Sequence, residues 1–248
     1  MSKKLQVGII GATGYVGQRF VSLLQDHPFF EIRKLAASER SAGKAYGDAL
    51  QNKQHDFLKL NEKTSKIILD RLNIEDVPTF ARDLDFCFCA VNMEKDAIVA
   101  LEEALAKEGL GVVSNNSANR LKPDVPMVIP EINPQHFDMI EQQRKRLGTD
   151  TGFIVCKPNC SIQSYVPALH ALKKWEPDVV FVSTYNAISP AGKPFATWPG
   201  TTDNSMPYIG GEEEKSEQEP HKIWGQITED GIVASEKPAI SAHCFRVG

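Results

Sequence analysis

The feature that most constrains the fold is a glycine-rich run, GATGYVG at residues 11–17, between an apolar segment and an amphipathic one. Residues 5–10 have the length and apolar character of a strand, and apolar side chains recur at helical spacing over residues 15–25. A second strand is predicted over residues 32–37. This order is typical of a dinucleotide-binding unit, because glycines let the backbone approach a pyrophosphate at a helix N-terminus. The alternative is a tight turn without a ligand. The residues expected at the cofactor are Gly11, Thr13, Gly14, Tyr15, Val16 and Gly17.

The end of the second predicted strand bears on the choice between NAD and NADP. An acidic residue there binds a ribose hydroxyl of NAD, whereas a nearby arginine accommodates the 2′-phosphate of NADP. The sequence places Arg40 between Glu39 and Ser41, with Ser38 before Glu39. We predict NADP, with Ser38, Arg40 and Ser41 at its phosphate. The alternative is that these are solvated turn residues.

The alternation of strands and helices continues toward the middle of the chain. Strands are predicted over residues 84–91, 111–114 and 153–156, and helices over residues 94–107 and 137–147. The first of these strands is almost continuously apolar, as expected for a parallel strand covered on both faces. Residues 178–185 are rich in β-branched side chains and are more typical of an antiparallel sheet. We predict an α/β fold, with a Rossmann-type doubly wound parallel sheet over residues 1–157 and an α+β domain over residues 158–248.

Composition excludes several classes of protein. The chain has 248 residues, of which 42% are apolar, and a formal net charge of -4, so it lacks the basic character of nucleic-acid-binding proteins. Its apolar runs are far shorter than the ~20 residues of a membrane span, and its N-terminus does not resemble a signal peptide. Five cysteines form no regular framework. We therefore expect reduced thiols in a cytoplasmic protein, without a membrane or nucleic-acid partner.

One cysteine lies where a reactive thiol is expected. Cys160, in KPNCS at residues 157–161, follows a predicted strand and precedes an apolar, helix-like segment. A helix N-terminus favours the thiolate, and its backbone N–H groups can hold an oxyanion. The alternative is a small buried apolar residue, which is how we interpret Cys87, Cys89 and Cys244. Cys156 and Cys160 lack a second pair of ligands at zinc spacing, so no metal site is predicted.

Five motifs occur in a fixed order: GATGYVG, SNNSANR at residues 114–120, PEINP at 130–134, KPNCS, and GGEEEK at 210–215. Together they resemble the aspartate-semialdehyde dehydrogenase family over essentially the whole chain. The resemblance implies an NADP-dependent oxidoreductase of lysine, threonine and methionine biosynthesis, which forms L-aspartate 4-semialdehyde from L-aspartyl 4-phosphate. It also implies a second, dimerisation and catalytic domain, and a homodimer or homotetramer at full length.

The resemblance implies a role for each of several residues. Cys160 would attack the acyl carbon, release phosphate and form a thioester that NADPH reduces. Asn159 would orient the substrate, Arg120 and Lys215 would bind phosphate, and Glu212 and Arg246 would bind the substrate amino and carboxylate groups. By residue type alone, Glu212 fits an exposed acidic helix start, and the two arginines fit surface charges. Further cofactor contacts are implied at Ala90 and Ser189.

The sequence departs from the family pattern in three places. Asn186 stands where the family has a substrate-binding glutamine, and Pro190 interrupts a glycine-rich turn near the nicotinamide. The general acid/base histidine of the family lies beyond Arg246, and none of the six histidines matches it. These departures predict a chain that binds NADP and turns over poorly. The alternatives are an acyl reductase similar to malonyl-CoA reductase, or a truncated, non-catalytic NADP-binding protein. The PGCY motif of N-acetyl-glutamyl-phosphate reductases does not match KPNCS.

Overall fold

The computed structural model describes residues 3–187 and 204–247, which divide into two compact units. The first unit contains the chain up to Asn119 and returns for Ile140–Lys157, whereas the second contains Arg120–Met139 and the chain from Pro158 onward. This grouping differs from the predicted continuous domain over residues 1–157 at residues 120–139. This segment is held by the second unit, where Lys222 Nζ donates to three of its carbonyl groups.

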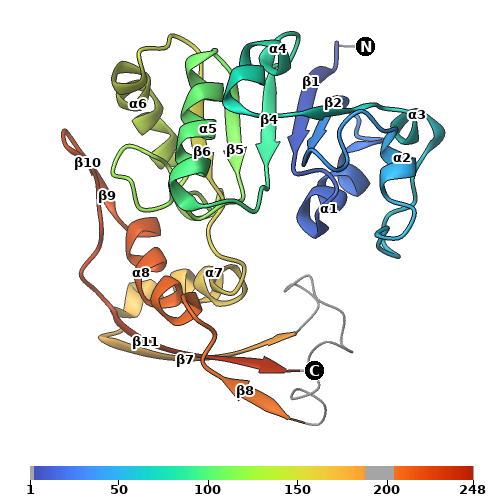
Figure 1. Cartoon of the computed structure of the whole chain (residues 1–248). Helices are drawn as coiled ribbons and strands as arrows, with labels where there is room; N and C mark the ends of the chain where they lie inside the picture. Colours follow the sequence, from blue (N-terminus) through green and yellow to red (C-terminus); the bar gives the residue numbers. More distant parts are fainter. Residues whose placement is uncertain (1–2, 188–203, 248) are drawn as a thin grey trace. The chain divides into compact units, whose positions relative to one another are not determined.

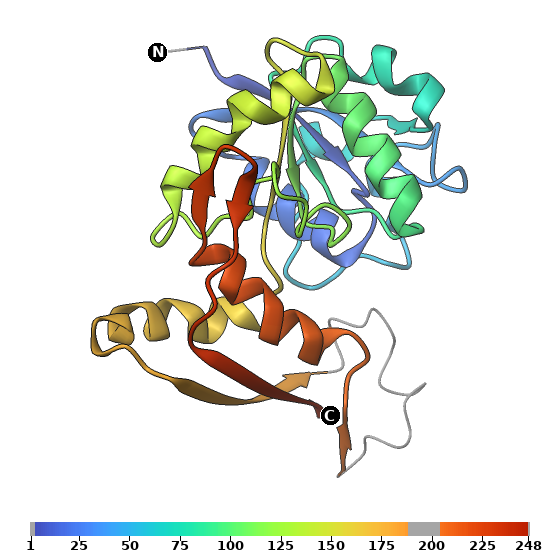
Figure 2. The ribbon, with the colours of Figure 1, turned by 90° about the vertical axis from the view of Figure 1, so that its left-hand side faces the viewer.

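The first unit is built on a parallel sheet, as predicted. Its six strands lie in the order β3-β2-β1-β4-β5-β6 (Figure 1). Their bounds are β1 Leu5–Ile10, β2 Phe30–Ala37, β3 Leu69–Arg71, β4 Phe86–Cys89, β5 Gly111–Ser114 and β6 Phe153–Cys156. The order reverses at the β1–β4 pair, so right-handed crossovers place helices α1 (Tyr15–Leu24) and α5 (Lys95–Lys107) on opposite faces (Figures 1 and 2). The reversal point is where such sheets bind ligands.

The core of this unit follows from the apolar pattern of the strands. Val7, Ile9 and Leu35 are fully buried, and Val21 of α1 packs into the same cluster. The buried Cys87 and Cys89 confirm the prediction of two core thiols. The predicted helix over residues 137–147 forms as a 3-10 turn, Pro134–Met139, followed by α6 (Ile140–Leu147). Three short helices were not predicted, because four or five residues show no periodicity: α2 Tyr46–Ala49, α3 Glu62–Ser65 and α4 Val77–Ala81.

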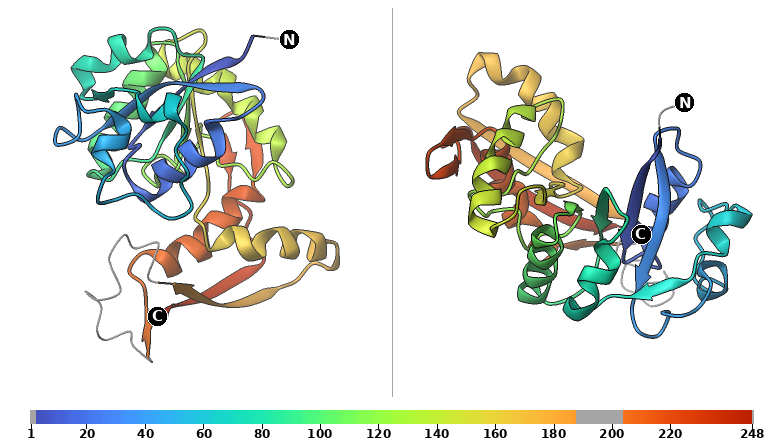
Figure 3. Two further views of the ribbon diagram at one scale, coloured as in Figure 1. Left: turned by 90° about the vertical axis from the view of Figure 1, so that its right-hand side faces the viewer. Right: turned by 90° about the horizontal axis from the view of Figure 1, so that it is seen from above.

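The second unit contains a three-stranded mixed sheet, of order β7-β11-β8, and a β9–β10 hairpin (Figure 3). Its elements are α7 Ile162–Leu172, β7 Val179–Ala187, β8 Ser205–Pro207, α8 Glu212–Ile223, β9 Gln226–Thr228, β10 Gly231–Val233 and β11 Ala239–Val247. Strand β7 pairs parallel to β11, and β11 pairs antiparallel to β8. Residues 178–185, which are more typical of an antiparallel sheet, therefore pair parallel with β11 within a sheet that is mixed overall. Their β-branched content indicates a half-buried pleated surface and does not define strand direction.

The two faces of this sheet differ sharply. Val182, Ala242 and Cys244 point to one face and are buried, which confirms the interpretation of Cys244 as core. Helices α7 and α8 lie along the sheet (Figure 2), and carboxylates of α8 accept hydrogen bonds from the Ala242 and Cys244 N–H groups. On the opposite face, Phe181 is 80% exposed and Tyr185 is 66% exposed. The second unit thus leaves an aromatic sheet face without cover from its own described residues.

Candidate active site

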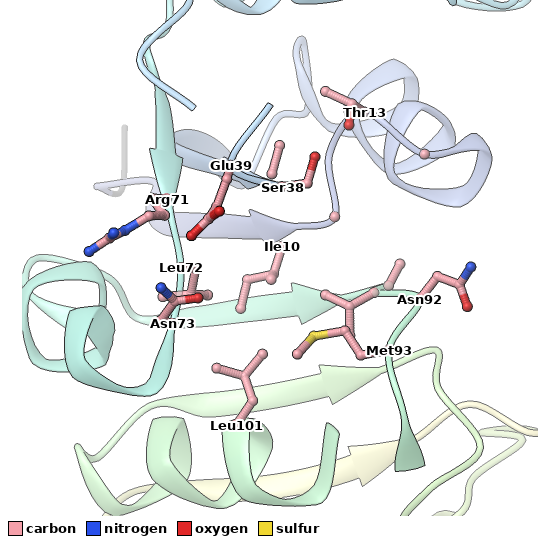
Figure 4. A pocket seen from close by; sticks show the side chains of 15 residues that line it. Ile10, Thr13, Ser38, Glu39, Arg71, Leu72, Asn73, Asn92, Met93 and Leu101 are labelled. Atoms are coloured by element: carbon pink, nitrogen blue, oxygen red, sulfur yellow. The ribbon is translucent and has the colours of Figure 1, made fainter. Parts of the chain in front are cut away.

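A pocket of about 390 Å³ lies at the carboxyl ends of the first unit's strands (Figure 4). Five predicted cofactor residues line it: Gly11, Thr13, Gly14, Ser38 and Ala90. Most of the other residues that line the pocket were not predicted from the sequence. They come from the end of β3, from the segment after β4 and from helix α5. These residues include Arg71, Leu72, Asn73, Asn92, Met93 and Leu101 (Figure 4). The pocket lies where the strand order reverses, the position expected for a dinucleotide.

The glycines of the loop have different physical roles. A Cβ added at Gly11, where φ is +81°, would lie 2.2 Å from the Ala90 carbonyl oxygen. One added at Gly17 would lie 2.1 Å from the Gly11 carbonyl oxygen. Both positions therefore need glycine for backbone packing. A Cβ at Gly14 would meet only the Gly11 carbonyl oxygen, at 3.4 Å, so glycine here leaves the pocket open at the start of α1.

Several predicted cofactor residues lie away from this pocket lining. The Tyr15 ring packs edge-on against His55 and Phe57, and Gly17 is buried. Arg40 and Ser41 line a separate hollow of about 270 Å³. Val16 at the start of α1 is also outside the lining, and Ser189 and Pro190 lie outside the described residues. The pocket lining instead contains another cation, Arg71.

Arg71 follows directly from the register of the sheet. It pairs with Ala37, the residue before Ser38, so it borders the strand end that selects the cofactor. Its Nε and Nη2 atoms donate to the Asp76 carboxylate at 3.2 and 3.4 Å, and its side chain is 51% exposed. An ion pair this exposed contributes little stability, so the guanidinium is free to turn toward an anion.

The second unit carries Cys160, and this is the one exposed cysteine among the five of the chain, all of which the structure describes. Its neighbours Asn159 and Ser161 are buried, at 5% and 6% exposure. The Asn159 Oδ1 atom accepts hydrogen bonds from Ser161 N at 2.8 Å and Ser161 Oγ at 2.5 Å. This local turn presents the Cys160 thiol to solvent immediately before α7, which begins at Ile162.

Four predicted residues lie together around this turn: Cys160, Asn159, Glu212 and Lys215. Asn159 Nδ2 donates to Glu212 at 2.9 Å, and Lys215 Nζ donates to the same carboxylate at 2.8 Å. Burial alone would raise the pKa of Glu212, but these hydrogen bonds and the positive charges of Lys215 and Arg120 together hold that pKa below its ordinary value. Glu212 is therefore an anion fixed beside the nucleophile loop. The amide of Asn159 is engaged within the loop and by Glu212, which favours a role in shaping the loop.

Arg120 joins this group through a residue that sequence reasoning missed. The buried Glu219 carboxylate accepts Arg120 Nη1 at 2.8 Å with one oxygen and Asn159 N at 2.6 Å with the other. Lys222, one turn further along α8, donates to the Arg120 carbonyl at 2.6 Å. The available signal was the spacing of Glu212, Lys215, Glu219 and Lys222, which puts all four on one helix face.

The other two predicted substrate residues form a pair in the sheet. Asn186 of β7 lies opposite Arg246 of β11 in the parallel register, so their side chains point to the same face. Arg246 Nη1 donates to the Ala187 carbonyl at 2.9 Å, and Asn186 Nδ2 donates to Thr184 Oγ1 at 3.1 Å. The hydrogen bonds described for these two side chains stay within the sheet.

The SNNSANR motif donates hydrogen bonds to a second carboxylate that sequence reasoning missed, in the first unit. Glu102 of α5 is fully buried and accepts hydrogen bonds from Ser114 Oγ at 2.6 Å, Asn116 Nδ2 at 2.8 Å and Asn119 Nδ2 at 2.7 Å. The polar residues of this motif therefore satisfy a buried charge, as buried carboxylates require. They fix the chain that leads into Arg120.

Comparison with known families also gives two parts, although the first family model includes residues 120–139, which the structure groups with the second unit. Residues 6–140 match the family model described as "Semialdehyde dehydrogenase, NAD binding domain". Residues 167–248 match "Semialdehyde dehydrogenase, dimerisation domain". The fold and the site thus define a protein of the semialdehyde dehydrogenase class.

Individual relatives narrow the assignment. Aspartate-semialdehyde dehydrogenase of Aspergillus fumigatus is 40% identical over 99% of this chain and 66% of its own length. That of Methanothermobacter thermautotrophicus is 41% identical over 98% of this chain and 67% of its own. The crystal structure of the Candida albicans enzyme with NADP has a TM-score of 0.84 and 36% identity, and covers 99% of this chain and 68% of that one. The chain belongs to the aspartate-semialdehyde dehydrogenase family, and it spans about two thirds of the length of these relatives.

Proposed function

We propose that this protein performs the NADP-dependent reductive dephosphorylation of L-aspartyl 4-phosphate to L-aspartate 4-semialdehyde. The observation that best supports this proposal is the exposed Cys160 thiol, held between two buried residues in a loop that Glu212 and Glu219 bind. The Cys160 thiolate attacks the acyl carbon, and the bond from this carbon to the phosphate oxygen breaks. Inorganic phosphate departs, and the acyl group remains on Cys160 as a thioester. Arg120 and Lys215 hold the phosphate, and NADPH supplies the hydride when it is bound.

The first unit fits the cofactor. Its pocket has a glycine loop at the start of α1, which suits the pyrophosphate. Ser38 and Arg71 line the same pocket at the ends of β2 and β3. Arg71 adds a cation that the sequence did not indicate, and Arg40 lies two residues after Ser38 in the chain. These groups favour NADP over NAD, although Glu39 also lines the pocket.

The charges of the second unit suit an amino-acid substrate. The Glu212 carboxylate is an anion available to an ammonium group, and Arg246 with Asn186 offers donors to a carboxylate. The malonyl group of malonyl-CoA has no ammonium to pair with Glu212, so aspartyl phosphate is the better match. An exposed thiol nucleophile also needs a reducing compartment, which suits a cytoplasmic enzyme.

The test is the reverse reaction. The protein, L-aspartate 4-semialdehyde and NADP should give NADPH at a rate that depends on inorganic phosphate. The rate should be lower with NAD, and it should fall by at least ~10³-fold in Cys160→Ser, since the nucleophile is lost. A rate that is the same in Cys160→Ser, or that does not respond to phosphate, would exclude this function. Reduction of malonyl-CoA in place of the semialdehyde reaction would favour the alternative.

We also propose that two copies of the chain associate through the exposed face of the β7–β11 sheet. The dimerisation-domain match spans these strands, and Phe181, Tyr185 and Phe245 supply the aromatic side chains that interfaces favour. The Tyr185 and Phe245 rings stack with centroids 5.3 Å apart, which makes the face rigid. A twofold pairing would bury this face against itself.

Phe181→Asp should therefore convert the dimer into a monomer. A charge placed at the centre of an apolar interface costs several kcal/mol of association energy, about a 100-fold or greater loss of affinity. Light scattering after size exclusion measures the molar mass. Phe29→Asp is the matched control, because Phe29 is 66% exposed but lies in the first unit. An unchanged molar mass in Phe181→Asp would contradict the proposed interface.

A further inference from the structure

Helix α8 has a charged face, and the residues in the second half of this face have no role in the proposed function so far. Glu212, Lys215, Glu219 and Lys222 follow one another at spacings of three, four and three residues, so they share one side of the helix. The first two are partly exposed, whereas Glu219 and Lys222 are 2% and 4% exposed. Burying a charge is unfavourable unless it is paired and hydrogen-bonded, so this arrangement requires specific partners.

The partners of Glu219 come from two distant parts of the chain. Arg120 Nη1 lies 2.8 Å from Oε1, and the side chains of this ion pair are 7% and 3% exposed. Asn159 N lies 2.6 Å from Oε2. One carboxylate therefore joins the guanidinium expected to bind phosphate to the backbone amide that precedes Cys160.

We propose that Glu219 is a positioning residue, which sets the Arg120 guanidinium relative to the Cys160 loop so that a phosphate group binds beside the thiol. This inference rests on the proposed function. Both oxygens of Glu219 act as acceptors, a requirement that only a carboxylate meets. In Glu219→Gln the amide NH2 group would face either the Arg120 guanidinium or the Asn159 N–H, so a donor would oppose a donor.

The substitutions distinguish positioning from packing. Glutamine matches glutamate in size, so a packing role predicts that Glu219→Gln is milder than Glu219→Asp. Positioning predicts the opposite order, since aspartate keeps two acceptor oxygens. We expect phosphate affinity to fall about 10- to 100-fold in Glu219→Gln, the scale that a displaced binding group produces, and to fall less in Glu219→Asp.

The experiment measures how inorganic phosphate slows the labelling of Cys160 by iodoacetate, whose carboxylate competes for the same cations. The readout is the phosphate concentration that halves the labelling rate. Glu217→Gln is the matched control, because Glu217 is on the same helix and its carboxylate also accepts a backbone N–H, that of Ala242. Circular dichroism confirms that each variant is folded, and Glu219→Asp serves if Glu219→Gln does not fold.

The outcomes separate the two proposals. A half-protecting concentration that rises in Glu219→Gln, rises less in Glu219→Asp and stays constant in Glu217→Gln supports the positioning role. An unchanged value in the Glu219 variants, or a larger effect for aspartate than for glutamine, overturns it while leaving the proposed function intact. Absence of protection in the unmodified protein overturns the phosphate site itself, and with it the proposed function and this inference.

Discussion

Iodoacetamide should label Cys160 at least ~100-fold faster than any other cysteine of the folded protein. Cys87, Cys89 and Cys244 are fully buried, and Cys156 is 1% exposed, so these four thiols meet the reagent only when the protein opens. Burial also raises the pKa of the Cys87 and Cys89 thiols well above their ordinary range, which removes the reactive thiolate. Peptide mass spectrometry of samples quenched over time measures each rate.

Unfolding provides the control for this experiment. In urea all five thiols are solvated, and their labelling rates should converge to within a few-fold. Cys160→Ser should leave a folded protein with almost no rapid labelling. If a second cysteine reacted as fast as Cys160 in the folded protein, the exposed-nucleophile assignment would lose its main support.

Lys222→Met should destabilise the second unit by roughly 3–5 kcal/mol. Lys222 Nζ donates to the carbonyl groups of Arg120, Lys122 and Val125 at 2.6, 2.5 and 2.7 Å, and methionine offers no donor to replace it. The Lys122 carbonyl keeps a donor in the Val125 N–H at 3.1 Å, whereas the buried Arg120 and Val125 carbonyls each lose the Lys222 donor at a cost of about 1–3 kcal/mol. The free energy of unfolding comes from a urea titration followed by tryptophan fluorescence.

The position of the tryptophans makes this measurement specific. Of the three tryptophans of the chain, Trp175 and Trp224 lie in the second unit and Trp198 lies outside the described residues, so the fluorescence of the two described ones reports on that unit. Lys237→Met is the matched control, because the ion pair of Lys237 with Asp178 is 78% and 82% exposed and should contribute under ~1 kcal/mol. Equal losses in the two variants would show that the Lys222 contacts contribute little.

The first unit was largely predictable from sequence because its signals are local. The glycine loop, the apolar strands and the helix at residues 94–107 all depend on residues close in the chain, and strands β1, β5 and β6 match their predicted bounds. Strand β3 was missed because a strand of three residues is too short to show a periodic pattern of apolar side chains. The pairing of β7 with β11 was not predictable in the same way, since it joins strands about fifty residues apart and depends on the packing between them.

The site was predictable only where a motif marks it. Cys160, Glu212 and Lys215 stand in motifs, whereas Glu219 and Lys222 lie in a helix whose charges resemble a solvated face. Their burial results from contacts across about sixty to one hundred residues of sequence. Arg71 was missed for a related reason, because only the β2–β3 register places it beside Ser38.

The interrupted second unit has a consequence for protein synthesis. Residues 120–139 leave the ribosome long before the helix that holds them, since Lys222 is added 102 residues after Arg120. At about 5–20 residues per second, this delay lasts roughly 5–20 seconds. During that time the segment lacks the Lys222 hydrogen bonds, although β6, which follows it in the chain, is already available to the sheet of the first unit. A chaperone that binds exposed apolar chain would have its best opportunity at this segment, whose Val125, Met127 and Ile129 become buried only afterwards.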